Sequence, residues 1–281
     1  MQTQTESGAQ VRPSRRARTR LHLGIVSAGI IAAWLASFAP PARAQDLSST
    51  EAVRALDARN ADEIRAGIES MGLAGSARSV PALERRIRRG LPPTLLRLAV
   101  DTLAMIGSRD AGPILLELLS HRRAEIRLAA IQGLVACRPR DTARALEAAL
   151  SDPDAGVRAA AAGGLGQVGA RAAVPTLFRA LDRGILEAAM AIGQLASAAQ
   201  VETLLGYVGR LPLDALTPGL MEILARDDIP ERTKLGVIHH LGELASPEVR
   251  IFLEALLDFL PPEGNDALRE AAEQIAMRIA Q

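Results

Sequence analysis

Cysteine and aromatic residues are scarce in this sequence. Cys137 is the single cysteine in 281 residues, so the chain can form neither an internal disulfide framework nor a zinc site built from cysteines. Aromatic residues make up only 2% of the chain, which leaves few side chains for stacking on bases or sugars. Apolar residues at 48% and charged residues at 23% are ordinary fractions, so a folded chain is expected.

Residues 1–44 have the pattern of an export signal. Five arginines precede residues 21–38, a stretch without Asp, Glu, Lys or Arg. Two prolines and then Ala42-Arg43-Ala44 follow, and such small-residue sites are where signal peptides are cut. We therefore expect a cleaved secretory signal and a periplasmic or extracellular protein. Because this 18-residue stretch just reaches the length of a membrane span, an uncleaved signal that anchors the chain to the inner membrane is the alternative.

Cleavage of that signal would change the net charge. The chain has 33 basic and 32 acidic residues, and residues 1–44 contain six arginines and one glutamate, which leaves 27 basic and 31 acidic residues, net −4. An acidic body is poorly suited to nucleic acids, whose phosphates must be neutralised by basic side chains. The sequence therefore predicts no nucleic-acid partner, and membrane contact only through the signal segment if that segment stays uncleaved.

A motif recurs with a period of 31 residues. It centres on Leu103, Leu134 and Leu165, and further copies centre on Ile192 and Leu241 after 27 and 49 residues. Around each centre, apolar residues stand at positions −4, −3, 0 and +3, which form one face of an α-helix. Gly107 and Gly169 follow two of the copies, where a helix end favours a left-handed residue.

A second apolar helix face follows each copy of the motif. Val174, Leu177, Phe178 and Leu181 show its spacing of i, i+3, i+4 and i+7, and no stretch shows the sustained alternation of a strand. The unit is therefore a helical hairpin of about 31 residues, and hairpins must stack because one pair cannot bury its own apolar face.

These patterns predict an all-α, right-handed α-solenoid of stacked antiparallel helix pairs. We expect an N-terminal linker or cap at residues 45–60 and an array of about six to seven units at residues 61–281. Pro212, Pro218 and Gly219 interrupt the pattern, so residues 211–228 are expected to form an irregular or unpaired helix.

Two segments resemble a known repeat family. Residues 125–130 (EIRLAA) and 152–160 (DPDAGVRAA) are similar to the opening of HEAT repeats, in the short bacterial form named after phycobilisome lyases. The resemblance covers residues 61–281 and is clearest in residues 91–200. In that family the arginine of the motif supports stacking between units, which implies this role for Arg127 and Arg158. Leu96 and Ile185 replace the arginine in other units.

Candidate chemical groups are few. Cys137 occupies the apolar column of the repeat, so we interpret it as a core residue. His239 and His240 lie about 100° apart on a helix, and with Glu243 nearby they are too few and too divergent for a metal centre. No phosphate-binding loop or nucleophile motif is present in the sequence. We therefore expect no cofactor, no metal and no enzymatic activity.

A basic cluster marks the second helix of the first unit. It indicates either an ordinary solvated face or a site for an anionic partner, and Tyr207 can likewise be a core residue or an exposed contact. The expected partner contacts, all placed on second helices, are Arg85, Arg88, Arg89, Arg179 and Tyr207.

The functional hypothesis from sequence is an exported, non-catalytic HEAT-repeat scaffold or adaptor. It would bind another protein or an envelope component through an extended helical surface. A lyase-like or metal-dependent HEAT-repeat enzyme and a purely structural spacer are the alternatives.

Overall fold

The computed structural model describes residues 49–261 and 263–280, which belong to one compact unit. Regular structure in these residues is helical, apart from one isolated β-bridge between Val208 and Leu211. The predicted signal at residues 1–44 lies outside the described residues. Among the helices that are described, none combines the length and the apolar character that a membrane crossing requires.

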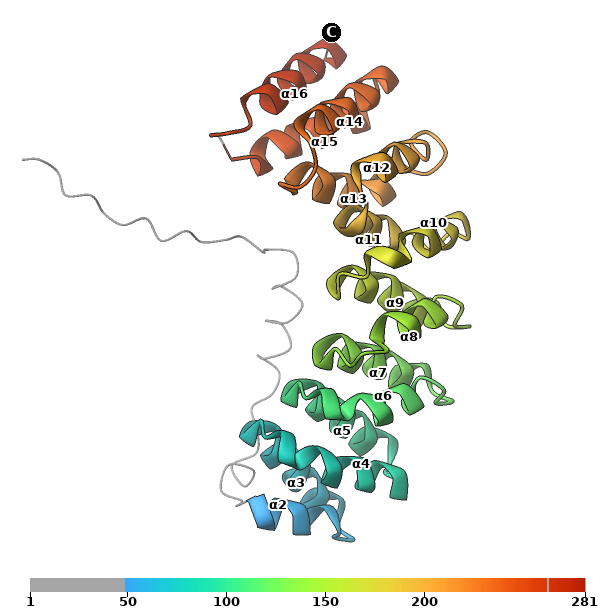
Figure 1. Ribbon diagram of the computed structural model, residues 1–281, viewed down its shortest axis with the longest axis vertical. Helices are drawn as coiled ribbons and strands as arrows, with labels where there is room; N and C mark the ends of the chain where they lie inside the picture. Colours follow the sequence, from blue (N-terminus) through green and yellow to red (C-terminus); the bar gives the residue numbers. More distant parts are fainter. Residues whose placement is uncertain (1–48, 262, 281) are drawn as a thin grey trace, which may run out of the picture. The chain divides into compact units, whose positions relative to one another are not determined.

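From α3 to α13 the helices alternate between two rows (Figure 1). One row contains α3 (Ala61–Ala74), α5 (Pro93–Ile106), α7 (Ala124–Cys137), α9 (Ala155–Gln167), α11 (Ala188–Leu195) and α13 (Leu213–Ala225). The other contains α4 (Val80–Arg89), α6 (Gly112–Leu118), α8 (Thr142–Ala149), α10 (Val174–Asp182) and α12 (Ala198–Leu205). We call these the first and second helices of the pairs. Three further helices, α14 (Glu231–Leu244), α15 (Pro247–Phe259) and α16 (Asp266–Ile279), follow, and α16 packs against both α14 and α15. The predicted all-α solenoid of helix pairs is confirmed.

Short turns join the two helices of a pair. Three of them contain a 3₁₀ turn, namely η1 (Ala77–Ser79), η2 (Arg109–Ala111) and η3 (Arg171–Ala173). The predicted left-handed residues precede them, with φ of 66° at Gly107 and 75° at Gly169. Proline occupies an early position in α4, α6 and α10, where the helix loses no internal hydrogen bond.

An additional helix, α2 (Ser49–Leu56), packs against α3. It falls in the segment predicted as a linker or cap, residues 45–60, whose first four residues lie outside the described part. Ala52 and Leu56 of α2 are buried, so this helix covers the apolar flank of the first pair.

The repeat motif forms the core of the array. Leu103, Leu134 and Leu165 have no exposed surface, and Cys137 is 2% exposed. The buried residues fall into two clusters, and both draw on α7: Ile126 and Leu134 belong to the N-terminal cluster, whereas Ile131 belongs to the C-terminal one. The helix α7 is therefore the element that both clusters share.

Residues 211–228, which were expected to form an irregular or unpaired helix, are helical over Leu213–Ala225. They contain α13, a continuous helix with Pro218 inside it, which packs against α11. The hydroxyl of Thr217 donates a hydrogen bond of 2.9 Å to the carbonyl of Leu213 in the turn around the proline. The helix α14, which carries the Leu241 motif, packs mainly against α16.

The contact between α11 and α13 depends on two glycines. A Cβ added to Gly193 would lie 2.6 Å from the Cα of Gly219, and one added to Gly219 would lie 2.7 Å from the carbonyl carbon of Ala189. Real Cβ atoms essentially never approach other atoms so closely. The backbones of these two helices are therefore in direct contact, which explains the glycine in the segment that looked like a helix breaker.

Arg127 connects neighbouring units. Its guanidinium donates to Asp152, in the turn before α9, at 2.7 Å (Nε to Oδ2) and 2.6 Å (Nη2 to Oδ1), and also to the carbonyl of His121. Arg158 donates to the carbonyls of Asp152 and Pro153 on the other side of the same turn. The stacking role that the resemblance implies for Arg127 is confirmed by these contacts, whereas Arg158 acts at the start of its own helix.

Candidate functional site

The basic cluster of α4 is largely engaged in ion pairs. Arg88 contacts Glu84 of its own helix at 2.8 Å and Glu117 of α6 at 3.2 Å, and Arg89 contacts Asp57, which follows α2. Because these side chains are half-exposed, each pair contributes about 0–1 kcal/mol to stability. Arg85 is exposed, and no carboxylate of the described residues pairs with it. The cluster therefore links second helices to their neighbours and offers Arg85 to solvent.

Similar contacts continue along the second row. The hydroxyl of Thr176 on α10 donates to Glu147 of α8 at 3.0 Å, and Arg179 donates to Thr176 at 2.9 Å. Arg183 reaches back to Ser151, after α8, at 3.3 Å. Arg179 is exposed, so it contributes to the outer surface of this row as the sequence predicts, three pairs away from the cluster on α4.

Tyr207 is buried, so its interpretation as an exposed contact is corrected. Its side chain is 8% exposed, and its ring stacks on Phe178 with the ring centroids 6.1 Å apart. The phenol donates a hydrogen bond of 2.7 Å to Asp182, and the guanidinium of Arg210 covers the ring at 5.0 Å from its centroid. The helix α12 ends at Leu205, so Tyr207 lies in the following turn, which directs its ring back onto α10.

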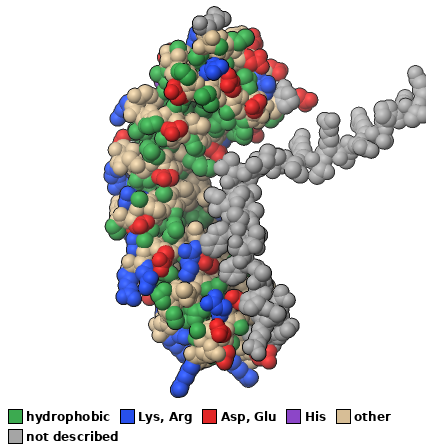
Figure 2. All heavy atoms as spheres, turned by 180° about the vertical axis from the view of Figure 1, so that it is seen from behind, with side chains coloured by type: hydrophobic (Ala, Val, Ile, Leu, Met, Phe, Trp, Pro, Cys, Tyr) green, Lys and Arg blue, Asp and Glu red, His purple; other side chains and the backbone are tan. Residues whose placement is uncertain are grey.

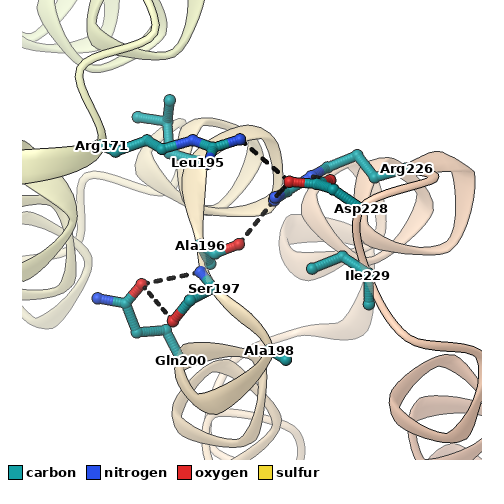
Figure 3. A pocket seen from close by; sticks show the side chains of 9 residues that line it. All are labelled: Arg171, Leu195, Ala196, Ser197, Ala198, Gln200, Arg226, Asp228 and Ile229. Carbon is teal, nitrogen blue, oxygen red and sulfur yellow. Dashed lines mark hydrogen bonds and ion pairs between the residues drawn. The ribbon is translucent and has the colours of Figure 1, made fainter.

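A shallow pocket of about 290 Å³ lies at the turns that follow α11 and α13 (Figure 3). Asp228 accepts two hydrogen bonds from Arg226, at 2.9 and 2.8 Å, and pairs with Arg171 of η3 at 3.0 Å. The hydrogen bonds from Arg226 lower the pKa of Asp228 to about 2. Arg226 also donates to the carbonyls of Gly193 and Ala196.

This pocket combines turns that are far apart in the sequence, and its polar groups mostly satisfy one another. Sequence reasoning missed it because no local motif marks residues 171, 197–200 and 226–229 as neighbours. The side chain of Arg171 is 71% exposed, whereas that of its partner Asp228 is 48% exposed and that of Arg226 is 14% exposed. The pocket therefore joins three turns and leaves Arg171 at the surface.

No metal-binding constellation is found among the described residues. The structure does not bring three His, Cys, Asp or Glu side chains together there, and His240 contacts Glu243 alone, at 3.7 Å. The histidine pair thus provides a single contact on the exposed side of α14.

The thiol of Cys137 is expected to be unreactive in the native protein. Burial raises the pKa of this thiol to about 11, and it donates a weak hydrogen bond to the carbonyl of Leu103 at 3.4 Å. At pH 8 we expect an aromatic disulfide reagent to modify the folded protein roughly 100-fold more slowly than the urea-unfolded chain, because the thiolate is the reactive form. Absorbance of the released thiol measures the rate; comparable rates in both states would contradict the core assignment.

Comparisons with known proteins support the repeat family. A model described as HEAT repeats matches residues 112–187, and one described as PBS lyase HEAT-like repeat matches residues 95–121. Among solved structures, the chain is similar to the complex of CpcE and CpcF of phycocyanin lyase from Nostoc sp. PCC7120, with 19% identity and a TM-score of 0.46. That alignment covers 80% of this chain and 97% of the other. No curated protein matches the sequence significantly.

The lyase-type match corrects one expectation. The absence of catalytic motifs led to the hypothesis that the chain is not an enzyme. Residues 95–121 match a repeat model of the PBS lyase type, and this match points toward a lyase-like protein. The expectation of a non-enzyme is therefore wrong.

Proposed function

We propose that this chain is an exported HEAT-repeat protein that binds a protein partner along the row of its second helices. The observation that supports the proposal is the chain of polar contacts across this row. Arg88 with Glu117, Thr176 with Glu147, and Tyr207 with Asp182 each join one second helix, or the turn after it, to its neighbour. A surface held in register over several units is suited to a macromolecule, because binding then requires little reordering.

The exposed arginines of this row are the proposed contacts. Arg85 on α4 and Arg179 on α10 project to solvent, and Arg88 and Arg89 lie next to Arg85 with part of their surface exposed. Arginine is common at protein interfaces since its planar group forms paired hydrogen bonds with carboxylates. The row therefore offers anchor points on separate units, which fits an extended contact.

Partner capture with charge variants tests this function. We expect the tagged protein to retain a stoichiometric partner from envelope fractions, and Arg85→Gln with Arg179→Gln to reduce its recovery at least about fivefold, since two interfacial charges are lost. Thr94→Glu with Gln132→Glu is the matched control, because it changes the net charge equally but lies on α5 and α7 of the first row. Equal recovery by both double variants would contradict the assignment of the surface.

A lyase-type activity on a bound partner is the second candidate. It is favoured by the similarity of residues 95–121 to PBS lyase repeats. A spectrum of the purified protein mixed with free phycobilisome pigment tests it: a shifted absorbance band that co-elutes with the protein in gel filtration supports the activity. Pigment that elutes separately, with an unshifted band, speaks against it.

A further inference from the structure

Four arginines recur at the period of the repeat, in the turns that join first to second helices. They are Arg78, Arg109, Arg140 and Arg171, and each stands 31 residues after the one before it. Arg78 belongs to η1, Arg109 to η2 and Arg171 to η3, while Arg140 lies in the turn between α7 and α8. All four are exposed. We call them the turn-edge row.

The turns that carry this row lie side by side. A Cβ added to Gly112, next to η2, would lie 2.7 Å from Cβ of Pro139 in the following turn. Arg138 of that turn donates a hydrogen bond of 2.9 Å to the carbonyl of Gln167, at the end of α9. Because stacked helices lie about 10 Å apart, successive arginines along this edge are separated by about the same distance.

Three members of the row have no acidic partner within the described residues. Arg78, Arg109 and Arg140 form no ion pair there, whereas Arg171 pairs with Asp228 at the rim of the pocket. Exposed guanidinium groups in a line with regular spacing concentrate positive potential along one edge. The row is therefore a site for a ligand with several negative charges.

The surroundings of the row differ in charge from the rest of the chain. Residues 76–144 contain 13 basic and 6 acidic residues, net +7, whereas residues 211–281 contain 6 basic and 13 acidic residues, net −7. In Figure 2, acidic side chains gather around the C-terminal helices at the top, and basic ones along the left edge and the lower part. The N-terminal and middle units thus form a positive region in a chain that is otherwise acidic.

We propose that the turn-edge row binds an extended acidic segment of the partner protein. A segment in the extended polyproline II conformation rises about 3.1 Å per residue with three residues per turn, so acidic residues at every third position share one face, repeat about every 9 Å and match the arginines. About ten residues span the four turns. This inference rests on the proposed function and specifies the chemistry of its partner.

The same charges disfavour a membrane surface as the ligand. A plane of anionic lipid extends beyond four turns and would also meet the acidic C-terminal units, where like charges repel over about 8 Å at physiological salt. A strand-sized segment contacts the row alone. The observations therefore favour a peptide ligand over a lipid one.

Fluorescence anisotropy with defined peptides tests the inference. The probe is a labelled twelve-residue peptide with glutamate at every third position and Gly-Ser between, and a peptide with the same composition but its glutamates in one block is the comparison. We expect salt-sensitive binding of the periodic peptide, with at least about threefold weaker binding of the block peptide, because only the former matches the spacing. Arg78→Gln, Arg109→Gln and Arg140→Gln together should weaken binding about tenfold or more.

The control variant removes the same charge outside the row. Arg122→Gln, Arg123→Gln and Arg144→Gln alter three exposed arginines on or next to second helices, and should weaken binding less than about threefold. Equal losses in both triple variants, or binding to anionic phospholipid vesicles without binding to the periodic peptide, would overturn the inference. If the native partner is captured equally by wild type and by the turn-edge variant, the proposed function stands and this inference alone fails.

Discussion

Replacing Gly193 by alanine is expected to lower the free energy of unfolding by about 3 kcal/mol or more. The new methyl group would lie 2.6 Å from the Cα of Gly219, so α11 and α13 must separate. The obstacle is backbone, which cannot rotate away as a side chain does. The higher helix propensity of alanine recovers only about 1 kcal/mol of the loss. Urea unfolding followed by circular dichroism measures the change.

Two other glycines supply the matched control. A Cβ added to Gly163 in α9 or to Gly236 in α14 meets no atom within 4 Å. Alanine at either position is expected to stabilise the protein by about 0.5–1 kcal/mol, because it restricts the unfolded chain and favours the helix. An increase in stability for Gly193→Ala as well would show that α11 and α13 are not in direct backbone contact.

Asp152→Asn is expected to destabilise the protein by about 3 kcal/mol, the second large effect. The side chains of Arg127 and Asp152 are only 11% and 10% exposed, and two hydrogen bonds join them. Removing the carboxylate leaves the guanidinium buried without its counter-charge, which costs more than the pair itself contributes. Thermal unfolding at pH 7 measures the loss.

The exposed pair of Arg250 and Glu254 serves as the control for Asp152→Asn. Both side chains are about half-exposed, so Glu254→Gln should change stability by less than about 1 kcal/mol. If the two variants lose equal stability, the contact between Arg127 and Asp152 has no special structural role.

The contribution of Asp152 should also depend on pH. The hydrogen bonds from Arg127 hold the pKa of Asp152 below its ordinary value in the folded protein. A carboxyl group whose pKa is lower in the folded than in the unfolded protein stabilises the fold at pH values above its unfolded pKa. This stabilisation is lost as the pH falls through the pKa of the folded state. The difference in melting temperature between wild type and Asp152→Asn should therefore shrink on acidification. A constant difference would mean that the carboxylate charge is not what stabilises the turn.

Sequence periodicity predicted much of the fold because each unit repeats the same local features of a helix and its end. An apolar stripe and a left-handed residue after it are visible within one unit, so Leu165 and Gly169 could be placed without knowledge of the neighbours. The helix α13 could not, because Pro218 and Gly219 are helix breakers when only local propensity is considered. Their positions make sense once α11 is known to lie against them.

The candidate site was less predictable for the same reason. Arg85 and Arg179 could be placed on the surface from helical spacing alone. The orientation of Tyr207 depends on where α12 ends and on the position of Phe178, one pair earlier in the array. The contact of Arg171 with Asp228 joins residues 57 positions apart, and no pattern in the sequence marks such a pair.

The double role of α7 has a consequence for how the molecule opens. Because this helix contributes to both core clusters, its two flanks are covered by different halves of the array. Either half of the array can then unfold while the other half still covers one side of α7 from solvent. Local unfolding should begin at the termini and proceed inward, and the backbone amides of α7 should be the last to exchange their hydrogens with solvent.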